Sequence, residues 1–504
     1  MPGVAAPRTS SKHVTFLRIW NQGRCVRDRR VDLGWKSSLS GIERPYLVLF
    51  ATLLIAVGLF GGSSRYDMMQ NALIQPVAWL VAGLALAMGG AGKATYRNLR
   101  WPLLMLLALL VITILQVIPL PYALWTSLPG REPLAEIATS VGSDIARPLS
   151  MVPSRTLNAL SALGIPLAAL LLLAGLGTRG AYIVLAAIVL LAAANALLAI
   201  LQIGSGYAEA GYLYSLTNEG TPVGIFANRN HSAVFGSLAM LVIGFLVTRS
   251  NRKAFPGSDV LLWSAFGAIF LVILVNGSRA GLLTAGIALA AAALLVVSGK
   301  PSVPSRPAGR RSSGSKRSNL ARYLPGAVIL FFAVGMIALF LLADRLTAFQ
   351  RIVEANPLED LRFRIVPILL DMIGTYFPLG TGLGAFEDVF RIHETPELLG
   401  PRYLNMAHND WLQWFLETGL PGAILLVAFL GWLGYQLLRL KSRGRDYMTL
   451  GLAGFAILAL ASYFDYPLRT PLFQVAGVWF VCALALLARA EGRETNQDPE
   501  VVTA

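Results

Sequence analysis

Long apolar runs alternate with short polar segments along the chain. Several runs extend for about 18 residues or more without a charge, which is the length a helix needs to cross a hydrocarbon core roughly 30 Å thick. Backbone groups in lipid must be hydrogen-bonded within their own segment, so these runs are predicted to be helices rather than strands. The pattern predicts an all-α polytopic membrane protein of about 12 transmembrane helices. They are expected at 45–61, 71–91, 101–120, 157–175, 180–203, 232–248, 259–276, 280–298, 324–342, 415–438, 448–464 and 471–488.

Composition supports this class. Of the 504 residues, 55% are apolar and 14% are charged, and the mean hydropathy is +0.62. An ordinary soluble domain is about one quarter charged, so soluble enzymes, fibrous proteins and disordered proteins are excluded. The two cysteines, Cys25 in a polar tail and Cys482 in an apolar run, predict no disulfide framework.

The distribution of positive charge predicts the orientation. With the N-terminus inside, 29 of the 42 Lys and Arg residues fall on the cytoplasmic side. Both termini are therefore expected in the cytoplasm. The chain divides into a basic N-tail (1–44), a membrane domain (45–488) containing a basic cytoplasmic linker (299–323), and a C-tail (489–504). The net charge of +15 is interpreted as a topology signal and a contact with anionic membrane lipids, not as a nucleic-acid surface.

Three segments longer than a turn are then expected outside, at 121–156, 204–231 and 343–414. Loops as long as the last one tend to be functional. Within it, a helix at about 358–375 is too short to span and is predicted to lie at the membrane interface. No convincing similarity relates the two halves of the chain, which weakens the alternative of a rocking transporter.

Polar groups gather just before the sixth and eighth helices. Asn228, Arg229, Asn230 and His231 form a dense set of donors for phosphate or sugar oxygens. The alternative is an interfacial helix cap with an arginine that reaches the interface. Arg279 lies in a tight turn between two apolar helices, where an arginine is costly unless it is solvated or paired. It is therefore a functional candidate.

Two further groups lie in the longest external segment. Arg362 and Arg364 are two residues apart and are expected on different faces of a helix. His408 precedes a helix and is suited to accept a proton near neutral pH. A structural cap is its alternative role. His393 is expected to be a solvated surface residue.

Missing motifs also discriminate between mechanisms. The sequence has no D-x-D, H-E-x-x-H, C-x-x-C, Walker or G-x-S-x-G motif. The glycines at 380–384 do not follow a strand in a βαβ unit, so a dinucleotide site is rejected. No metal site, nucleotide or other cofactor is expected.

Taken in order, the motifs resemble those of the O-antigen ligase family, which includes O-antigen and exopolysaccharide polymerases. The resembling parts cover about 220–430. They are G-x-F-x-N-x-N at 224–230, S-R-A-G at 278–281, the stretch from Arg364 to Met372, P-L-G-T-G-L-G-x-F at 378–386 and A-H-N-D-x-L-Q-x-x-x-E-x-G-L-P-G at 407–422.

The resemblance implies a metal-independent glycosyltransferase at the periplasmic face of the bacterial inner membrane. Its donor would be a glycan on a polyprenyl (undecaprenyl) diphosphate. A ligase passes this glycan to lipid A–core in lipopolysaccharide synthesis, whereas a polymerase passes it to another repeat unit. We favour the ligase and keep the polymerase as the alternative. A lipid-linked glycan transporter or a structural scaffold would leave Arg279 and His408 unexplained.

The residues suit this chemistry in definite roles. Fixed guanidinium groups can stabilise a diphosphate leaving group, for which Arg279 and Arg364 are the first choices and Arg229 the third. His408 is the expected base for the acceptor hydroxyl, and direct attack would invert the anomeric carbon. The remaining residues expected to bind substrate are Asn228, Asn230, Arg362, Asn409 and Asp410.

Overall fold

The structure is a computed structural model that describes residues 44–89, 93–142, 144–177, 179–249, 257–298, 362, 364–399 and 404–489. Four expected features lie wholly or largely outside the described residues: the basic N-tail, the linker at 299–323, the span at 324–342 and the C-tail. The first part of the 343–414 segment lies outside them as well.

The described chain is helical, which confirms the all-α class. The long helices are α2 (Arg44–Phe60), α3 (Met69–Ala87), α4 (Lys93–Val117), α7 (Pro153–Ala162), α8 (Gly164–Leu176), α9 (Gly180–Gly204), α10 (Arg229–Arg249), α11 (Ser258–Asn276), α12 (Arg279–Ser298), α18 (Asp410–Lys441), α19 (Arg445–Phe464) and α20 (Pro471–Leu487). Shorter helices are α5 (Tyr122–Trp125), α6 (Glu132–Ser140), α16 (Val366–Tyr376) and α17 (Phe386–His393), with 3-10 turns η1 (Glu209–Gly211), η3 (Pro396–Leu398) and η4 (Pro467–Arg469).

Nine helical segments of the described residues are long and apolar enough to cross a membrane. Two of the expected spans, α2 and α20, are not among these nine, because they have 17 residues each and the count requires 18. The expected fourth span begins earlier than predicted, at Pro153, and consists of α7 and α8 in succession. The predicted number of twelve is therefore not established by the described part of the chain.

Helix α10 forms the centre of the bundle and is buried from Asn230 to Leu246. It packs against α12, α11, α19 and α9. Small residues allow this close approach: a Cβ on Gly244 would lie 2.9 Å from the Cβ of Ala292 in α12. The Ala-rich run of α12 thus packs closely against α10.

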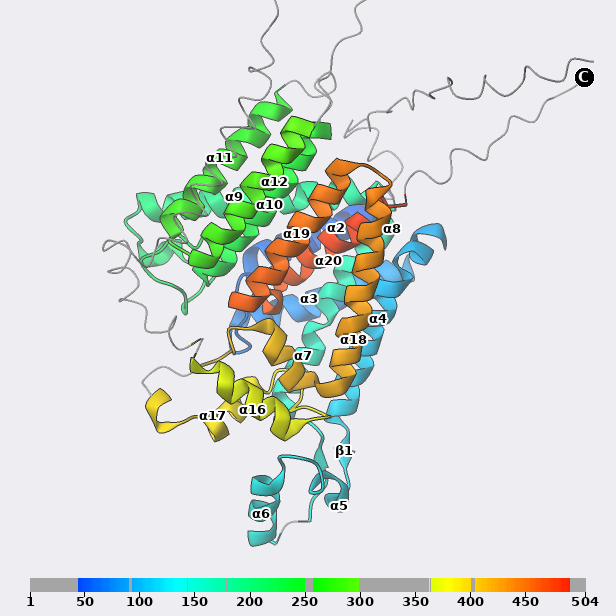
Figure 1. Ribbon diagram of the computed structural model, residues 1–504, viewed down its shortest axis with the longest axis vertical. Helices are drawn as coiled ribbons and strands as arrows, with labels where there is room; N and C mark the ends of the chain where they lie inside the picture. Colours follow the sequence, from blue (N-terminus) through cyan, green and yellow to red (C-terminus); the bar gives the residue numbers. More distant parts are fainter. Residues whose placement is uncertain are drawn as a thin grey trace, which may run out of the picture.

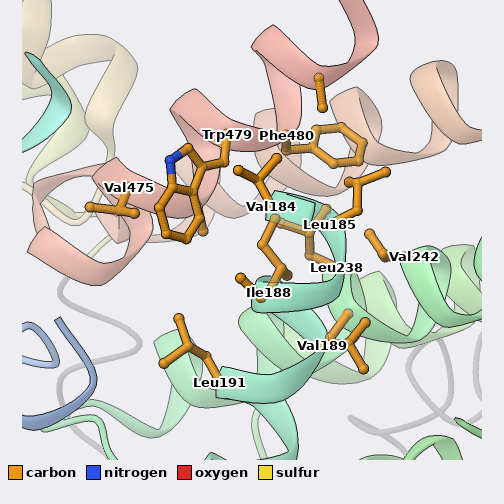
Figure 2. Packing of buried hydrophobic residues seen from close by; sticks show 14 of the residues in the cluster. Val184, Leu185, Ile188, Val189, Leu191, Leu238, Val242, Val475, Trp479 and Phe480 are labelled. Atoms are coloured by element: carbon orange, nitrogen blue, oxygen red, sulfur yellow. The ribbon is translucent and has the colours of Figure 1, made fainter. Parts of the chain in front are cut away.

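Helices α9 and α20 complete the core beside α10. Figure 2 shows Ile188 of α9, Leu238 of α10 and Trp479 of α20 in one apolar cluster. The indole nitrogen of Trp479 donates to the carbonyl of Ala169 in α8 at 3.1 Å, so the large ring is buried without an unsatisfied donor.

The short helices α5, α6, α16 and α17 lie together at one end of the bundle (Figure 1). Strands β1 (Pro119–Leu120) and β2 (Arg147–Pro148) pair antiparallel there. The guanidinium of Arg131 donates to the carbonyls of Leu149 at 2.7 Å and Gly380 at 3.2 Å, tying this hairpin to the segment before α17. The expected external segments thus meet on one side.

A glycine-rich turn joins α16 to α17 and packs against a kink in α18. Gly419 has φ +56° within α18, and a Cβ there would collide with the carbonyl oxygen of Pro378. Gly382 has φ +104°, and its Cβ would collide with the hydroxyl of Ser150. Glycine is required at both positions because of backbone conformation and close approach.

Of the predicted interfacial helix at 358–375, the structure describes residue 362 and the residues from 364 onward. Helix α16 begins at Val366, after a turn at Ile365, and has Pro367 in its first turn. Proline favours the first turn of a helix and cannot continue one through its missing N–H, so the boundary falls here. Arg362 and Arg364, which precede this boundary, are helical as well.

Candidate active site

A buried carboxylate, Asp465, lies at the centre of the polar end of the bundle, directly after α19. Its Oδ1 is 3.0 Å from Nδ1 of His408 and accepts the backbone N–H of Tyr466 at 3.1 Å. Its Oδ2 accepts the side-chain amide of Asn230 at 2.7 Å and that of Asn228 at 3.4 Å. A short segment between two helices therefore binds the starts of α10 and α18 together.

Two further side chains face the same carboxylate, the guanidinium of Arg362 and the imidazole of His231. Nη2 of Arg362 lies 3.8 Å from Oδ2, and Nε2 of His231 lies 3.9 Å from Oδ1. Burial alone would raise the pKa of Asp465. The charge of Arg362 and the hydrogen bond and charge of His408 lower it by more, so the pKa lies well below its usual value. Asp465 is thus a fixed anion at neutral pH. The Asp465 network denotes Asp465, His408, Arg362, His231, Asn228 and Asn230.

His408 is held in one orientation by this carboxylate. An ionised carboxylate can only accept, so the nitrogen facing it, Nδ1, must carry the proton. Burial lowers the pKa of His408, and the hydrogen bond to Asp465 raises it less. The ring is therefore neutral near pH 7, with its lone pair on Nε2. Tyr466 packs edge-on against it at 4.8 Å between centroids.

The backbone also fixes His408. Its φ of +50° is in the left-handed region, which few side chains adopt. The next residue, Asn409, caps α18 by accepting the backbone N–H of Leu412 at 3.1 Å. The expected substrate residue Asn409 thus lies beside the site as a helix cap.

The paired arginines of the long segment separate as expected. Arg362 is half-buried and donates to the carbonyl of Phe464 at 3.2 Å, next to Asp465. Arg364 is exposed, and its charge acts on Glu397 of η3. The structure therefore brings Arg362, rather than Arg364, into the Asp465 network.

The asparagines of the first cluster hold the network together. Asn228 caps the start of α10 by accepting the backbone N–H of Asn230 at 2.8 Å. The hydroxyl of Ser278 donates to Oδ1 of Asn230 at 2.7 Å and accepts the backbone N–H of Gly281 at 3.0 Å, so Ser278 caps α12. Arg279 follows directly and is half-buried.

The neighbouring residues His231 and Arg229 differ in burial. His231 is fully buried, with Nδ1 3.0 Å from the hydroxyl of Thr470. Arg229 is half-buried, and its backbone N–H donates to the side chain of Asn218 at 2.9 Å. Of the two, it is His231 that reaches the Asp465 network.

A second buried cluster, the Arg469 network, lies close by and consists of Arg469, Asp410 and Glu417. Nε of Arg469 donates to Asp410 at 3.1 Å, and Nη1 donates to Glu417 at 2.9 Å. Glu417 is fully buried and also accepts the side-chain amide of Gln413 at 2.9 Å. Asp410, which was expected to bind substrate, thus forms an ion pair with Arg469 of η4.

His393 differs from its expected role as a solvated residue. It is half-buried, and its Nε2 is 2.8 Å from the hydroxyl of Tyr376. Burial lowers its pKa. It packs in the α16–α17 layer and has no described contact with Asp465. Among the described residues, no group of three or more His, Cys, Asp or Glu side chains is placed to hold a metal ion.

Sequence reasoning missed Asp465, Tyr466 and Arg469. All three lie in the segment 465–470, which interrupts two apolar runs with an acid and an arginine. Charges at such an interruption are the signal that could have indicated the site.

Comparison with known proteins agrees with the motifs. No curated protein matches the chain. A family model described as O-Antigen ligase matches residues 263–427, which include Arg279, Arg362 and His408. The carboxylate Asp465 and its partner Asn230 lie outside the matched segment. The match confirms the resemblance and supports the assignment of the chain to the O-antigen ligase family.

Proposed function

We propose that the protein transfers a glycan from a polyprenyl (undecaprenyl) diphosphate to a hydroxyl of lipid A–core at the periplasmic face of the inner membrane. The family supports an enzyme of the ligase or polymerase type that acts on lipid-linked glycans. The observation that carries the proposal is the pair of His408 and Asp465, in which a buried carboxylate fixes the tautomer and orientation of a neutral imidazole.

The proposed step is a single displacement. His408 Nε2 takes the proton of the acceptor hydroxyl while that oxygen forms a bond to the anomeric carbon. The bond from this carbon to the diphosphate oxygen breaks, and the electron pair leaves with the diphosphate. Attack opposite to the leaving group inverts the anomeric configuration. Asp465 stabilises the imidazolium that forms, as in other carboxylate–histidine pairs.

Guanidinium groups are proposed to stabilise the leaving diphosphate. A planar guanidinium binds two phosphate oxygens at once and keeps its charge at any physiological pH. Arg362 adjoins the carboxylate of Asp465, and Arg279 follows the cap residue that binds Asn230. We assign these two to the diphosphate, with Arg229 third. Arg364 is exposed and is placed second to Arg362 in this role.

The orientation belongs to the same proposal. Charge distribution supports an orientation with both termini in the cytoplasm and the polar end of the bundle outside. Cysteine labelling in whole cells tests it: a cysteine at position 312 should resist a reagent that cannot enter the cell. Labelling of that position from outside would contradict the orientation.

Deletion of the gene in its host tests the reaction itself. For a ligase, polymer accumulates on the lipid carrier and is absent from lipid A–core on a gel of surface glycans. A core that carries single repeat units, or loss of a secreted polymer, indicates the polymerase of the same family. An unchanged glycan profile would contradict both.

A further inference from the structure

Four arginines converge at the end of the bundle opposite to the Asp465 network. Arg97 and Arg100 lie near the start of α4, Arg439 near the end of α18, and Arg489 just after α20. The other ends of α4 and α18 meet at the polar side, where Gln116 donates to the carbonyl of Glu417 at 3.0 Å. Helices α4 and α18 run side by side (Figure 1).

The cluster is built into the helix packing. Nη1 of Arg489 donates to the side-chain oxygen of Asn98 in α4 at 3.0 Å, so the end of α20 is fixed to α4. Nε of Arg489 is buried and has no hydrogen-bond partner in the described chain. A buried N–H without an acceptor is costly, which indicates a site for an acceptor from outside the chain.

Positive charge is uncompensated here. In the parts of the chain that the structure describes, none of the four arginines forms an ion pair. Burial lowers the pKa of Arg489, and the charges of Arg439, Arg100 and Arg97 lower it further. The four guanidinium groups therefore act on one another, and a bound anion would relieve their repulsion.

Exposed apolar side chains surround these charges. Arg100 lies over the ring of Trp101 at 5.3 Å, and Arg439 lies near the ring of Tyr435 at 5.9 Å from its centroid. Trp101 is 45% exposed, and Leu438 beside Arg439 is 69% exposed. Aromatic rings with arginines at the ends of membrane helices are typical of the lipid–water interface. A ligand bound here would meet guanidinium groups at one end and an apolar surface below them.

We propose that Arg97, Arg100, Arg439 and Arg489 bind the phosphate headgroup of an anionic phospholipid, with its acyl chains along the exposed faces of α4 and α18. Basic pockets between helices are a recurrent way to hold such headgroups. The site is separate from the transferase site, because it lies at the other end of the same helices.

Native mass spectrometry of the full-length protein, purified from detergent into nanodiscs, tests the proposal. The probes are phosphatidylglycerol, phosphatidylcholine and inorganic phosphate. Retention of phosphatidylglycerol is expected to fall roughly fivefold for each arginine removed. The test variants are Arg489→Gln with Arg439→Gln, and Arg97→Gln with Arg100→Gln. The matched control is Lys441→Gln, which removes an exposed charge at the same end of α18.

The results separate lipid from free anion. Loss of phosphatidylglycerol in both double variants, with normal retention in Lys441→Gln and little phosphatidylcholine throughout, supports the site. Retention of phosphatidylglycerol in the double variants equal to that of the unsubstituted protein overturns the proposal. Competition by inorganic phosphate at the same concentration as the lipid overturns the lipid assignment. If substitution of the half-buried pair Arg439 and Arg489 impairs folding, the variant of the exposed pair Arg97 and Arg100 still tests the proposal.

Discussion

Two buried polar networks lie at the ends of one short segment, yet they differ in their balance of charge and in how far their groups are already paired. The Asp465 network sets one carboxylate against a guanidinium and two imidazoles, since Arg362, His408 and His231 all face it. Since His408 is neutral near pH 7, the charge of Asp465 is balanced by Arg362, and the imidazole of His408 remains able to accept a proton.

The Arg469 network has more carboxylates than guanidinium groups. One guanidinium binds two carboxylates, and its hydrogen bonds to Asp410 and Glu417 measure 3.1 and 2.9 Å. Burial lowers the pKa of Arg469, but the charges of Glu417 and Asp410 raise it above its usual value. This network is closed, because its cation is fully committed to protein partners. We infer that it positions α18, and we propose that the Asp465 network performs the chemistry.

The largest effect should come from breaking the His408–Asp465 pair. His408→Ala removes the proposed base, and Asp465→Asn leaves the ring without its fixed tautomer. Each should reduce transfer by roughly 10²–10⁴-fold. The measurement is glycan transfer by purified protein, with size-exclusion chromatography to verify folding. His393→Ala is the matched control and should retain near-normal transfer. Near-normal transfer by His408→Ala would make the base assignment wrong.

Breaking the Arg469 network should lower stability instead. Arg469→Gln leaves two carboxylates buried without their cation, at a cost of about 3–5 kcal/mol. The melting temperature should fall, and so should the yield of monodisperse protein after heating. As a control, Arg391→Gln removes the exposed partner of Glu387 and should cost about 0–1 kcal/mol. An unchanged melting temperature for Arg469→Gln would contradict a positioning role.

Arg362 and Arg364, the two arginines just before α16, allow a half-buried and an exposed position to be compared. Arg362→Ala should reduce transfer by roughly 10²–10³-fold, because a donor to the leaving group is lost. Arg362→Lys should rescue poorly, since a point charge lacks the bidentate fork. Arg364→Ala, at an exposed position two residues away, is expected to have the smaller effect. If Arg364→Ala reduced transfer more than Arg362→Ala, Arg364 would be the main diphosphate-binding arginine of the two, as the sequence analysis expected.

The sequence predicts the helices better than it predicts the site. Uncharged runs determine which segments can enter lipid, and this local property places α9 and α10 within a few residues. The start of α16 and the joining of α7 to α8 depend on how proline and glycine meet neighbouring segments. Such contacts between distant segments have no local signal.

Site residues were predicted where a motif surrounds them. His408, Asn228 and Asn230 lie in the resembling motifs and meet in the structure. Asp465 lies 57 residues from His408 along the chain, in a segment without a motif. Spacing alone could not pair them, because their proximity arises from the packing of α18 against α19.

The smallest effect expected is a shift in the pH profile, which follows from the direction in which the pKa of His408 is shifted. Burial lowers this pKa from its ordinary 6.5, so the neutral base persists below pH 6.5. Transfer, measured as kcat/KM, should be constant near neutral pH and fall as pH drops through the lowered value. Since the charge of Asp465 raises the pKa of His408, residual transfer by Asp465→Asn should fall only at still lower pH. His393→Ala should leave the profile unchanged. A rate that rises on acidification would show that the group at position 408 acts protonated, which is incompatible with a base.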